Sequence, residues 1–200
     1  GRMAKVMIES AINGNAVKDL NPNIPYSPEE IANDAIATCQ AGAALIHFHV
    51  RNPDNGAWVQ DLTYYSEVYK RTREKCHPLL WPTFPFGNDP AARFKHFYDL
   101  AKDPQTKPDL GAGDMGSVNL VAYDPLTKNL GEGGFVYQNS YDTIKYFLEG
   151  SNELGLRPTL QIFDASFLRA ALIFLEKGVL TEPLLLKFYF GGPELPFGLP

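Results

Sequence analysis

Residues 44–51 read Ala-Leu-Ile-His-Phe-His-Val-Arg, an apolar run that two histidines interrupt. The apolar and β-branched residues predict a buried strand. Side chains on a strand alternate between its faces, so His47 and His49 are expected to point the same way. Two adjacent imidazoles supply half of a tetrahedral shell, and zinc is the first candidate metal. From the pair alone, a metal site and two structural histidines both remain open.

Composition limits the classes of protein that this chain can represent. The 200 residues are 44% hydrophobic and 12% aromatic, which suits one globular domain with a sizeable core. The net charge of −5, spread with mixed signs, gives no basis for binding nucleic acid or a membrane surface. We find no apolar run of about 20 residues and no signal peptide, and expect a cytoplasmic protein.

We also predict where the other two histidines lie and whether the two cysteines form a disulfide. His77 precedes Pro78, and His96 lies in a charged helical stretch, so both are expected at the surface. Cys39 and Cys76 lack Cys-x-x-Cys spacing and are expected to be free thiols of a reducing compartment.

Strand-like and helix-like segments alternate along the chain. Ser27 with Glu30 forms a capping-box pattern that starts the first helix. The expected strands are 5–11, 44–51, 79–84, 116–122, 159–163 and 184–190, and the expected helices are 28–40, 62–75, 91–102, 139–154 and 167–177. Such alternation predicts an α/β fold with a parallel sheet covered by helices.

Two parallel architectures compete for this pattern. A doubly wound sheet is the less favoured, because the first strand–helix turn lacks a Gly-x-Gly-x-x-Gly loop. A (β/α)8 barrel is favoured, because polar residues recur after several strands, where such barrels place their sites. Only about six β/α units are present, and strand 184–190 would be an apolar edge. We therefore expect residues 1–200 to be a single barrel domain truncated at its C-terminal end.

Several motifs, taken in order, resemble the β-keto acid cleavage enzymes, whose best-known member is the 3-keto-5-aminohexanoate cleavage enzyme. The hallmark is His-Phe-His-Val-Arg at 47–51. The others are Pro-Glu-Glu-Ile-Ala at 28–32, Asp-Met-Gly-Ser-Val-Asn at 114–119, Gly-Leu-Arg-Pro at 155–158 and Ile-Phe-Asp at 162–164. The ordered set runs through the whole chain and is more specific than the hallmark alone.

The resemblance implies a (β/α)8 barrel and a divalent metal, usually zinc, held by His47, His49 and a glutamate near the eighth strand. That glutamate, the base and a carboxylate-binding arginine are expected beyond Pro200, so this chain should not be catalytically complete. The implied enzyme is an acyl-CoA-dependent C–C cleaving transferase. It converts a β-keto acid and acetyl-CoA, a co-substrate, into acetoacetate and a new acyl-CoA. Family barrels usually assemble as homotetramers.

The resemblance also nominates substrate-binding residues. Asn15 stands about where amino-substrate members carry a glutamate, and Gln161 where the fifth strand often has one, which suggests a neutral or differently charged substrate side chain. The further candidates are Thr83, Asp114, Ser117 and Asn119, each of which could instead cap a helix. Arg51 is expected to brace a loop or pair with an acid, and Asp164 to cap the fifth helix.

Two rival functions remain open at this stage. One is a metal-dependent barrel hydrolase, a superfamily that places His-x-His at the end of the first barrel strand, whereas here the strand 5–11 precedes the pair. The other is a non-catalytic barrel relative that binds a small acid or a partner, which the residues Asn15 and Gln161 keep open.

Overall fold

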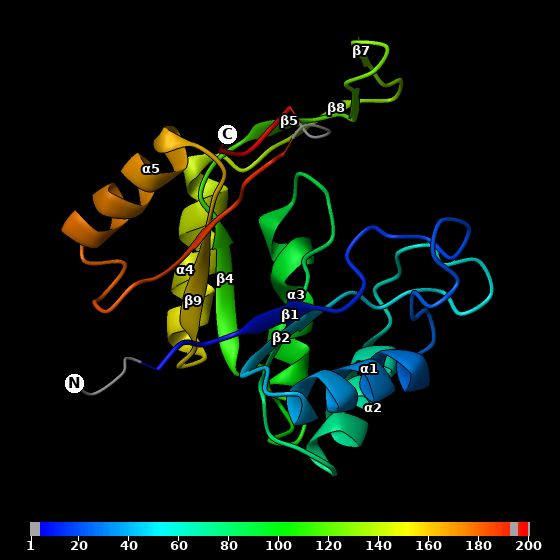
Figure 1. Ribbon diagram of the computed structural model, residues 1–200. Coiled ribbons are helices and arrows are strands. Elements are labelled where there is room, and N and C mark those ends of the chain that lie inside the picture. The colour runs from blue at the N-terminus through cyan, green and yellow to red at the C-terminus, as the bar shows by residue number, and fades with distance from the viewer. Residues whose placement is uncertain (1–4, 193–195, 200) are drawn as a thin grey trace. The chain divides into compact units, whose positions relative to one another are not determined.

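Parallel β/α units make up most of the computed structural model, which describes residues 5–192 and 196–199 (Figure 1). The chain divides into two units. The first comprises Gly1–Pro85 with Lys95–Asp109, and the second comprises Phe86–Phe94 with Leu110–Pro200. Helix α3 (Pro90–Leu100) contributes residues to both.

The first unit is a three-stranded parallel sheet with helices on one face. Its strands are β1 (Glu9–Ala11), β2 (Leu45–Phe48) and β3 (Leu79–Pro82), in the order β1-β2-β3, and its helices are α1 (Pro28–Gln40) and α2 (Leu62–Arg73). Ile46 and Phe48 join the core formed with these helices. Because strand side chains alternate, His47 lies on the opposite, helix-free face. Ala11, His47 and Trp81 form one row across the sheet.

The second unit repeats this arrangement. Strands β4 (Leu110–Asp114), β9 (Arg157–Ile162) and β10 (Leu185–Phe188) are parallel in the order β10-β9-β4, and α4 (Tyr141–Glu153) and α5 (Ala165–Glu176) pack against them. Leu160 and Ile162 enter the core on the helix side. The neighbouring Thr159 and Gln161 therefore occupy the helix-free face.

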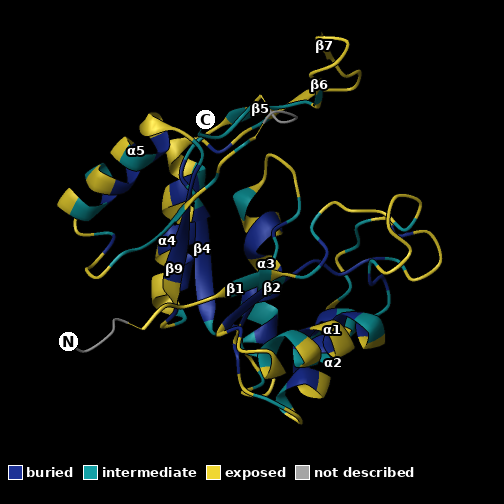
Figure 2. Cartoon of the chain, viewed as in Figure 1, coloured by how far each residue is buried: buried dark blue, intermediate teal, exposed yellow. Residues whose placement is uncertain are grey.

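The predicted fourth strand is wrong in position. The parallel strand is β4, Leu110–Asp114, where two glycines hide the strand pattern, although a Cβ at Gly111 would lie 2.2 Å from Ser151 Oγ. The predicted segment 116–122 instead enters an antiparallel excursion. Strand β5 (Val118–Leu120) pairs with β8 (Phe135–Tyr137), and β6 (Tyr123–Asp124) pairs with β7 (Asn129–Leu130). The tip of this excursion is largely exposed (Figure 2).

Helix starts follow the predicted capping chemistry. Ser27 Oγ accepts from the Glu30 backbone N–H, while the Glu30 carboxylate accepts from the Ser27 N–H, so the capping box is confirmed. The side chains of Ser140, Asp164 and Asp61 accept backbone N–H groups at the starts of α4, α5 and α2, without the reciprocal bond of the capping box. The role predicted for Asp164 is thus confirmed as a structural one.

Replacing Glu30 with glutamine should remove an acid-sensitive part of the stability. Hydrogen bonds from Lys18 and from the backbone at Ser27 lower the pKa of Glu30 from 4.5 to about 2. The carboxylate therefore contributes stability above pH 4.5 and loses it as pH falls toward 2. We expect Glu30→Gln to unfold about 0.5 kcal/mol more easily at pH 7, because the Lys18 pair is partly exposed, and the difference should vanish near pH 2. Urea titrations across this range would measure it, and a constant difference would contradict it. The exposed neighbour Glu29→Gln is the control.

His96 is buried, so its predicted surface position is wrong, whereas His77 is exposed as predicted. His96 Nε2 donates to the Thr83 carbonyl at 2.7 Å, and its ring lies 5.1 Å from that of Tyr65. The neighbouring Lys95 is exposed, and the charged residues of this helix, of which Arg93 is also buried, concealed its buried face in the sequence.

The two cysteines are free, as predicted, but they are neighbours in space. Cys39 lies in the last turn of α1, and its thiol is beside that of Cys76. Burial, with the Cys39 thiol beside it, raises the pKa of Cys76 to about 12. A thiol protonated at neutral pH is a poor nucleophile, so we assign Cys76 a structural role.

The helices were compared with the length and apolarity of a membrane-spanning helix. In the described part of the chain, none combines the length and the apolar character that crossing a bilayer requires.

Candidate metal centre and strand-end sites

His47 and His49 converge at the C-terminal end of β2. Their Nε2 atoms lie 3.1 Å apart, and their rings meet edge to face at a centroid distance of 4.9 Å. The prediction that both side chains project to one side of the strand is therefore confirmed. The pair presents two imidazole nitrogens to a single point.

Trp81 fixes the orientation of His47. The Trp81 carbonyl accepts a hydrogen bond from His47 Nδ1 at 3.2 Å, and the two rings stack at 3.9 Å. A carbonyl can only accept, so Nδ1 carries the proton and the Nε2 lone pair is available to a metal. Trp81 is itself held by Glu9, whose carboxylate accepts from the indole N–H at 2.9 Å.

His49 is buried and neutral. Burial, assisted by the positive charge of Arg51, lowers its pKa to about 3. Its ring meets the edge of Trp58 at 4.6 Å, and its Nδ1 has no hydrogen-bond partner among the described residues. A neutral imidazole is the form that binds a metal.

Asn13 holds the backbone of His49, a role that the sequence analysis missed. Its Oδ1 accepts from the His49 N–H at 3.0 Å, and its Nδ2 donates to the His49 carbonyl at 2.8 Å. Nδ2 also donates to the Pro25 carbonyl at 3.1 Å. The Asn13 side chain is 4% exposed, and both ends of its amide are used. It therefore joins the loop after β1 to the residue that carries one imidazole.

Arg51 braces the same loop, as predicted. The guanidinium donates to the carbonyls of Gly14, Ala16 and Gly56 at 2.5, 2.9 and 2.7 Å. The side chain is 2% exposed and lies over the Tyr26 ring. These contacts commit the guanidinium to holding the backbone of the two loops.

The histidine pair fits a tetrahedral metal. Bonds of about 2.0–2.1 Å to zinc would separate two ligand nitrogens by about 3.3 Å, close to the observed 3.1 Å. The Trp81 carbonyl, which holds the proton of His47 on Nδ1, leaves the Nε2 of this ring to face a metal. Within residues 5–192 and 196–199, no group of three or more His, Cys, Asp or Glu side chains could hold a metal.

A second polar cluster lies in the second unit, at the end of β4. The Tyr137 hydroxyl donates to Asp114 Oδ2 and accepts from Arg93 Nη2 at 3.0 Å. Arg93 is buried and also donates to Asn139 Oδ1 at 2.9 Å. Burial raises the pKa of Asp114, while Tyr137, Arg93 and Lys187 act in the opposite direction. Tyr137 and Arg93 were missed because their contacts join residues that lie 44 and 23 positions apart in the sequence.

Gln161 lies beside Asp114 on the helix-free face. Its amide is satisfied when the carbonyl oxygen accepts from Thr159 Oγ1 at 2.7 Å. The amide nitrogen is then 2.9 Å from the Gly113 carbonyl and 3.3 Å from Asp114 Oδ1. Gln161 is 2% exposed, so its amide is buried at the strand ends and is not a surface group.

The other predicted substrate residues are dispersed. Thr83 directly follows β3 and is half-buried, whereas Asn15 is exposed in the loop after β1. Ser117 Oγ accepts from the Asn139 N–H at 2.9 Å and lines a pocket of about 290 Å³. Asn119 is exposed on β5, outside the parallel sheet. The structure thus brings Asp114 and Gln161 together in the second unit. Ser117 and Asn119 do not lie on a strand of the parallel sheet.

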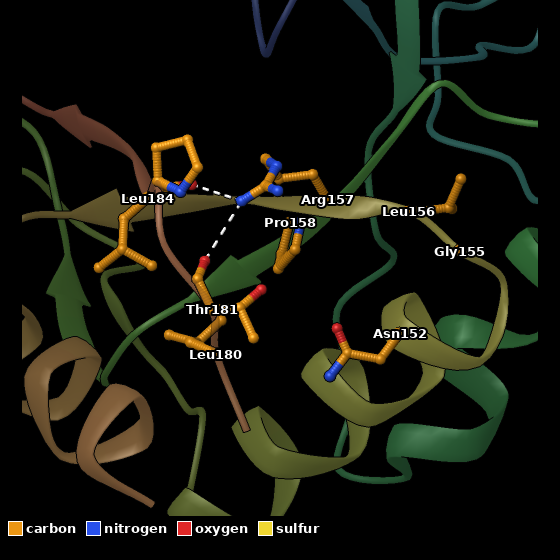
Figure 3. Close-up of a pocket in the computed structure, with 9 residues that line it drawn as sticks. Asn152, Gly155, Leu156, Arg157, Pro158, Leu180, Thr181 and Leu184 are labelled. Carbon is orange, nitrogen blue, oxygen red and sulfur yellow. Dashed lines mark hydrogen bonds between the residues drawn. The ribbon is translucent and has the colours of Figure 1, made fainter. Parts of the chain in front are cut away.

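Another pocket, of about 270 Å³, lies at the N-terminal end of β9 (Figure 3). There the Arg157 guanidinium donates to the carbonyls of Thr181 and Pro183 and so ties the segment before β10 to β9. Parallel barrels place active sites at the opposite, C-terminal strand ends. We assign this pocket to stability.

The chain is similar to a known protein family over nearly its whole length. The family model described as beta-keto acid cleavage enzyme matches residues 5–200. The 3-keto-5-aminohexanoate cleavage enzyme of Fusobacterium nucleatum is 29% identical over 94% of this chain and 64% of its own length. The 3,5-dioxohexanoate:acetyl-CoA acetone transferase of Paraburkholderia graminis is 27% identical over 94% of this chain and 63% of its own.

A solved structure supports the fold. The ternary complex of ObcA with a C4-CoA adduct and oxalate has a TM-score of 0.62 and 19% identity, over 88% of this chain and 41% of that one. The chain spans less than two thirds of the length of the two curated relatives above. The family model nevertheless covers nearly all of its residues. The chain therefore belongs to the β-keto acid cleavage enzyme family.

Proposed function

We propose that the intact protein converts a β-keto acid and acetyl-CoA into acetoacetate and a new acyl-CoA. The family match across residues 5–200, joined to the converging Nε2 atoms of His47 and His49, carries this proposal. Relatives whose printed names are acetyl-CoA transferases support acetyl-CoA as the co-substrate. The match disfavours the barrel hydrolase alternative.

His47 and His49 would hold a divalent metal, with zinc preferred. When bound, the metal supplies Lewis-acid stabilisation of negative charge on a substrate oxygen. Trp81 and Asn13 orient the two histidines, and burial keeps His49 neutral. The third protein ligand, the base and the carboxylate-binding arginine are proposed to lie outside residues 1–200.

The proposed substrate-binding residues differ in where they lie and in whether their polar atoms already have hydrogen-bond partners. Asp114 and Gln161 lie together at the strand ends and can orient a bound oxygen group. Thr83 and Asn15 follow β3 and β1. Ser117 and Asn119 also remain candidates, although the Ser117 hydroxyl already bonds to the backbone of Asn139.

We further infer a single (β/α)8 barrel domain for the intact protein, of which the described residues supply six parallel strands and five helices. The six parallel strands and the structural neighbour support it. A homotetramer follows from the family resemblance, and a cytoplasmic location agrees with the free thiols of Cys39 and Cys76.

Elemental analysis of the intact protein tests the metal site. We expect about one divalent metal per chain in the wild type and near none in His47→Ala/His49→Ala, with loss of acetyl-CoA-dependent acetoacetate formation. His77→Ala, which removes an exposed histidine, should keep both metal and activity. A wild type without metal, or a double variant that retains it, would refute the proposal.

A further inference from the structure

The indole of Trp81 crosses the sheet of the first unit beside His47. Trp81 lies on β3 and Glu9 on β1, and β2 runs between these two strands. The Trp81 indole N–H nevertheless donates to the Glu9 carboxylate at 2.9 Å. The Trp81 ring also stacks on that of His47, with centroids 3.9 Å apart and planes 30° apart. The indole therefore spans β2 and forms the surface against which the imidazole lies.

Strand register places these three side chains on one face of the sheet. His47 is the register partner of both Ala11 and Trp81, and register partners in parallel strands point the same way. Glu9 lies two residues before Ala11 on β1, so it shares that face. Each of the three residues belongs to a strand, so the sheet itself brings together Glu9 and Trp81, which are 72 positions apart in the sequence.

Two contacts fix the His47 ring, and each restrains a different motion. The hydrogen bond from Nδ1 to the Trp81 carbonyl, at 3.2 Å, fixes the position of one ring atom. The stacked indole fixes the plane of the ring, and so the direction in which Nε2 points. Trp81 is 3% exposed, and a buried indole N–H that loses its acceptor is destabilised in that position. The Glu9 carboxylate thus holds the plane of the imidazole through the indole.

We propose that Glu9 is a positioning residue, which holds His47 through Trp81 in the orientation that a bound metal requires. This role rests on the metal site proposed above. In the part of the chain that the structure describes, Glu9 forms no three-ligand group with the two histidines, so the role assigned to it is not that of a ligand. Outer partners of metal-binding imidazoles change metal affinity by about 10- to 100-fold. Glu9 acts through one intervening side chain, so its effect should lie near the lower end of that range.

Zinc titration of the intact protein against a competing chelator tests this role. We expect Glu9→Leu to raise the Kd for zinc about tenfold. Glu9→Gln should keep the wild-type Kd, because its amide oxygen can still accept from the indole. Glu74→Leu, which removes an exposed glutamate after α2, is the control and should also keep it. A purely structural Glu9 would instead lower the stability of Glu9→Leu and leave its Kd unchanged.

A double-mutant cycle shows whether Glu9 acts through the indole. Trp81→Phe keeps a ring but removes the N–H, so it should weaken zinc binding as Glu9→Leu does. Adding Glu9→Leu to Trp81→Phe should then cause no further loss. Independent, additive losses, or wild-type Kd in a folded Glu9→Leu, would overturn the inference. If Glu9→Leu does not fold, Trp81→Phe alone decides, and wild-type affinity in that variant would overturn it.

A measurement without metal separates this inference from the proposed metal site. Nitrogen-15 NMR of the metal-free protein reports which His47 nitrogen carries the proton. We expect the Nδ1–H form in the wild type and in Glu9→Gln, and a mixture of both forms in Glu9→Leu. That result would support the positioning role even if the wild type bound no zinc, which would overturn only the metal site. In a wild type without zinc, the Nδ1–H form retained in Glu9→Leu would overturn the inference as well.

Discussion

Arg51→Met should lower the free energy of unfolding by about 3–5 kcal/mol. The guanidinium is 2% exposed and donates to three backbone carbonyls, those of Gly14, Ala16 and Gly56. Methionine fills part of the space but donates nothing, so these acceptors lose their charged donor within a buried region. Chemical denaturation of the intact protein would measure the loss.

A matched control separates this effect from loss of a surface charge. Arg71 on α2 pairs with Glu67 at 2.7 Å and is about half exposed. Arg71→Met should cost at most about 0.5 kcal/mol, because solvent screens such pairs. If the two variants were equally stable, the three carbonyl bonds of Arg51 would contribute nothing, contrary to the structure.

Asn13→Ala should weaken metal binding about 10- to 100-fold while leaving both imidazoles in place. The variant removes the acceptor for the His49 N–H and the donor to the His49 carbonyl. The His49 backbone would then adopt several positions, and the two Nε2 atoms would no longer be held 3.1 Å apart. Zinc titration against a competing chelator measures the affinity directly, independently of turnover.

The loop supplies its own control for this prediction. Asn15 lies two residues away but is exposed. Asn15→Ala should keep zinc affinity and change only the choice of substrate. Asn13→Asp is a stricter variant, because aspartate can accept from the His49 N–H but cannot donate to its carbonyl. Wild-type zinc affinity in Asn13→Ala would show that the His49 backbone needs no support from this amide.

Local sequence rules predicted the regular elements well. The capping box at Ser27 and Glu30 and the cap at Asp164 start their helices as expected, because these contacts span only a few residues. The alternation of strands and helices likewise predicted the parallel pairing. The fourth strand was misplaced because Gly111 and Gly113 lack side chains that would show a period, although close packing against α4 requires them there.

The sequence predicted the histidine pair of the candidate site but not the residues that surround it. The histidine pair lies within a single strand, so a two-residue period suffices to bring its rings together. Asn13 contacts a residue 36 positions away, and Tyr137 contacts one 23 positions away. No local pattern encodes such contacts. The contact of Trp81 with Glu9 likewise joins residues 72 positions apart, across the strand that lies between them.

The two tryptophans of the chain give the histidine pair an optical signal of its own. The sequence contains only Trp58 and Trp81, and the structure places one against each imidazole. Tryptophan emission from this chain therefore originates next to His47 and His49. A paramagnetic ion such as Cu²⁺ held by the pair would quench this emission, so the chain carries an intrinsic fluorescent indicator of occupancy that needs no added dye.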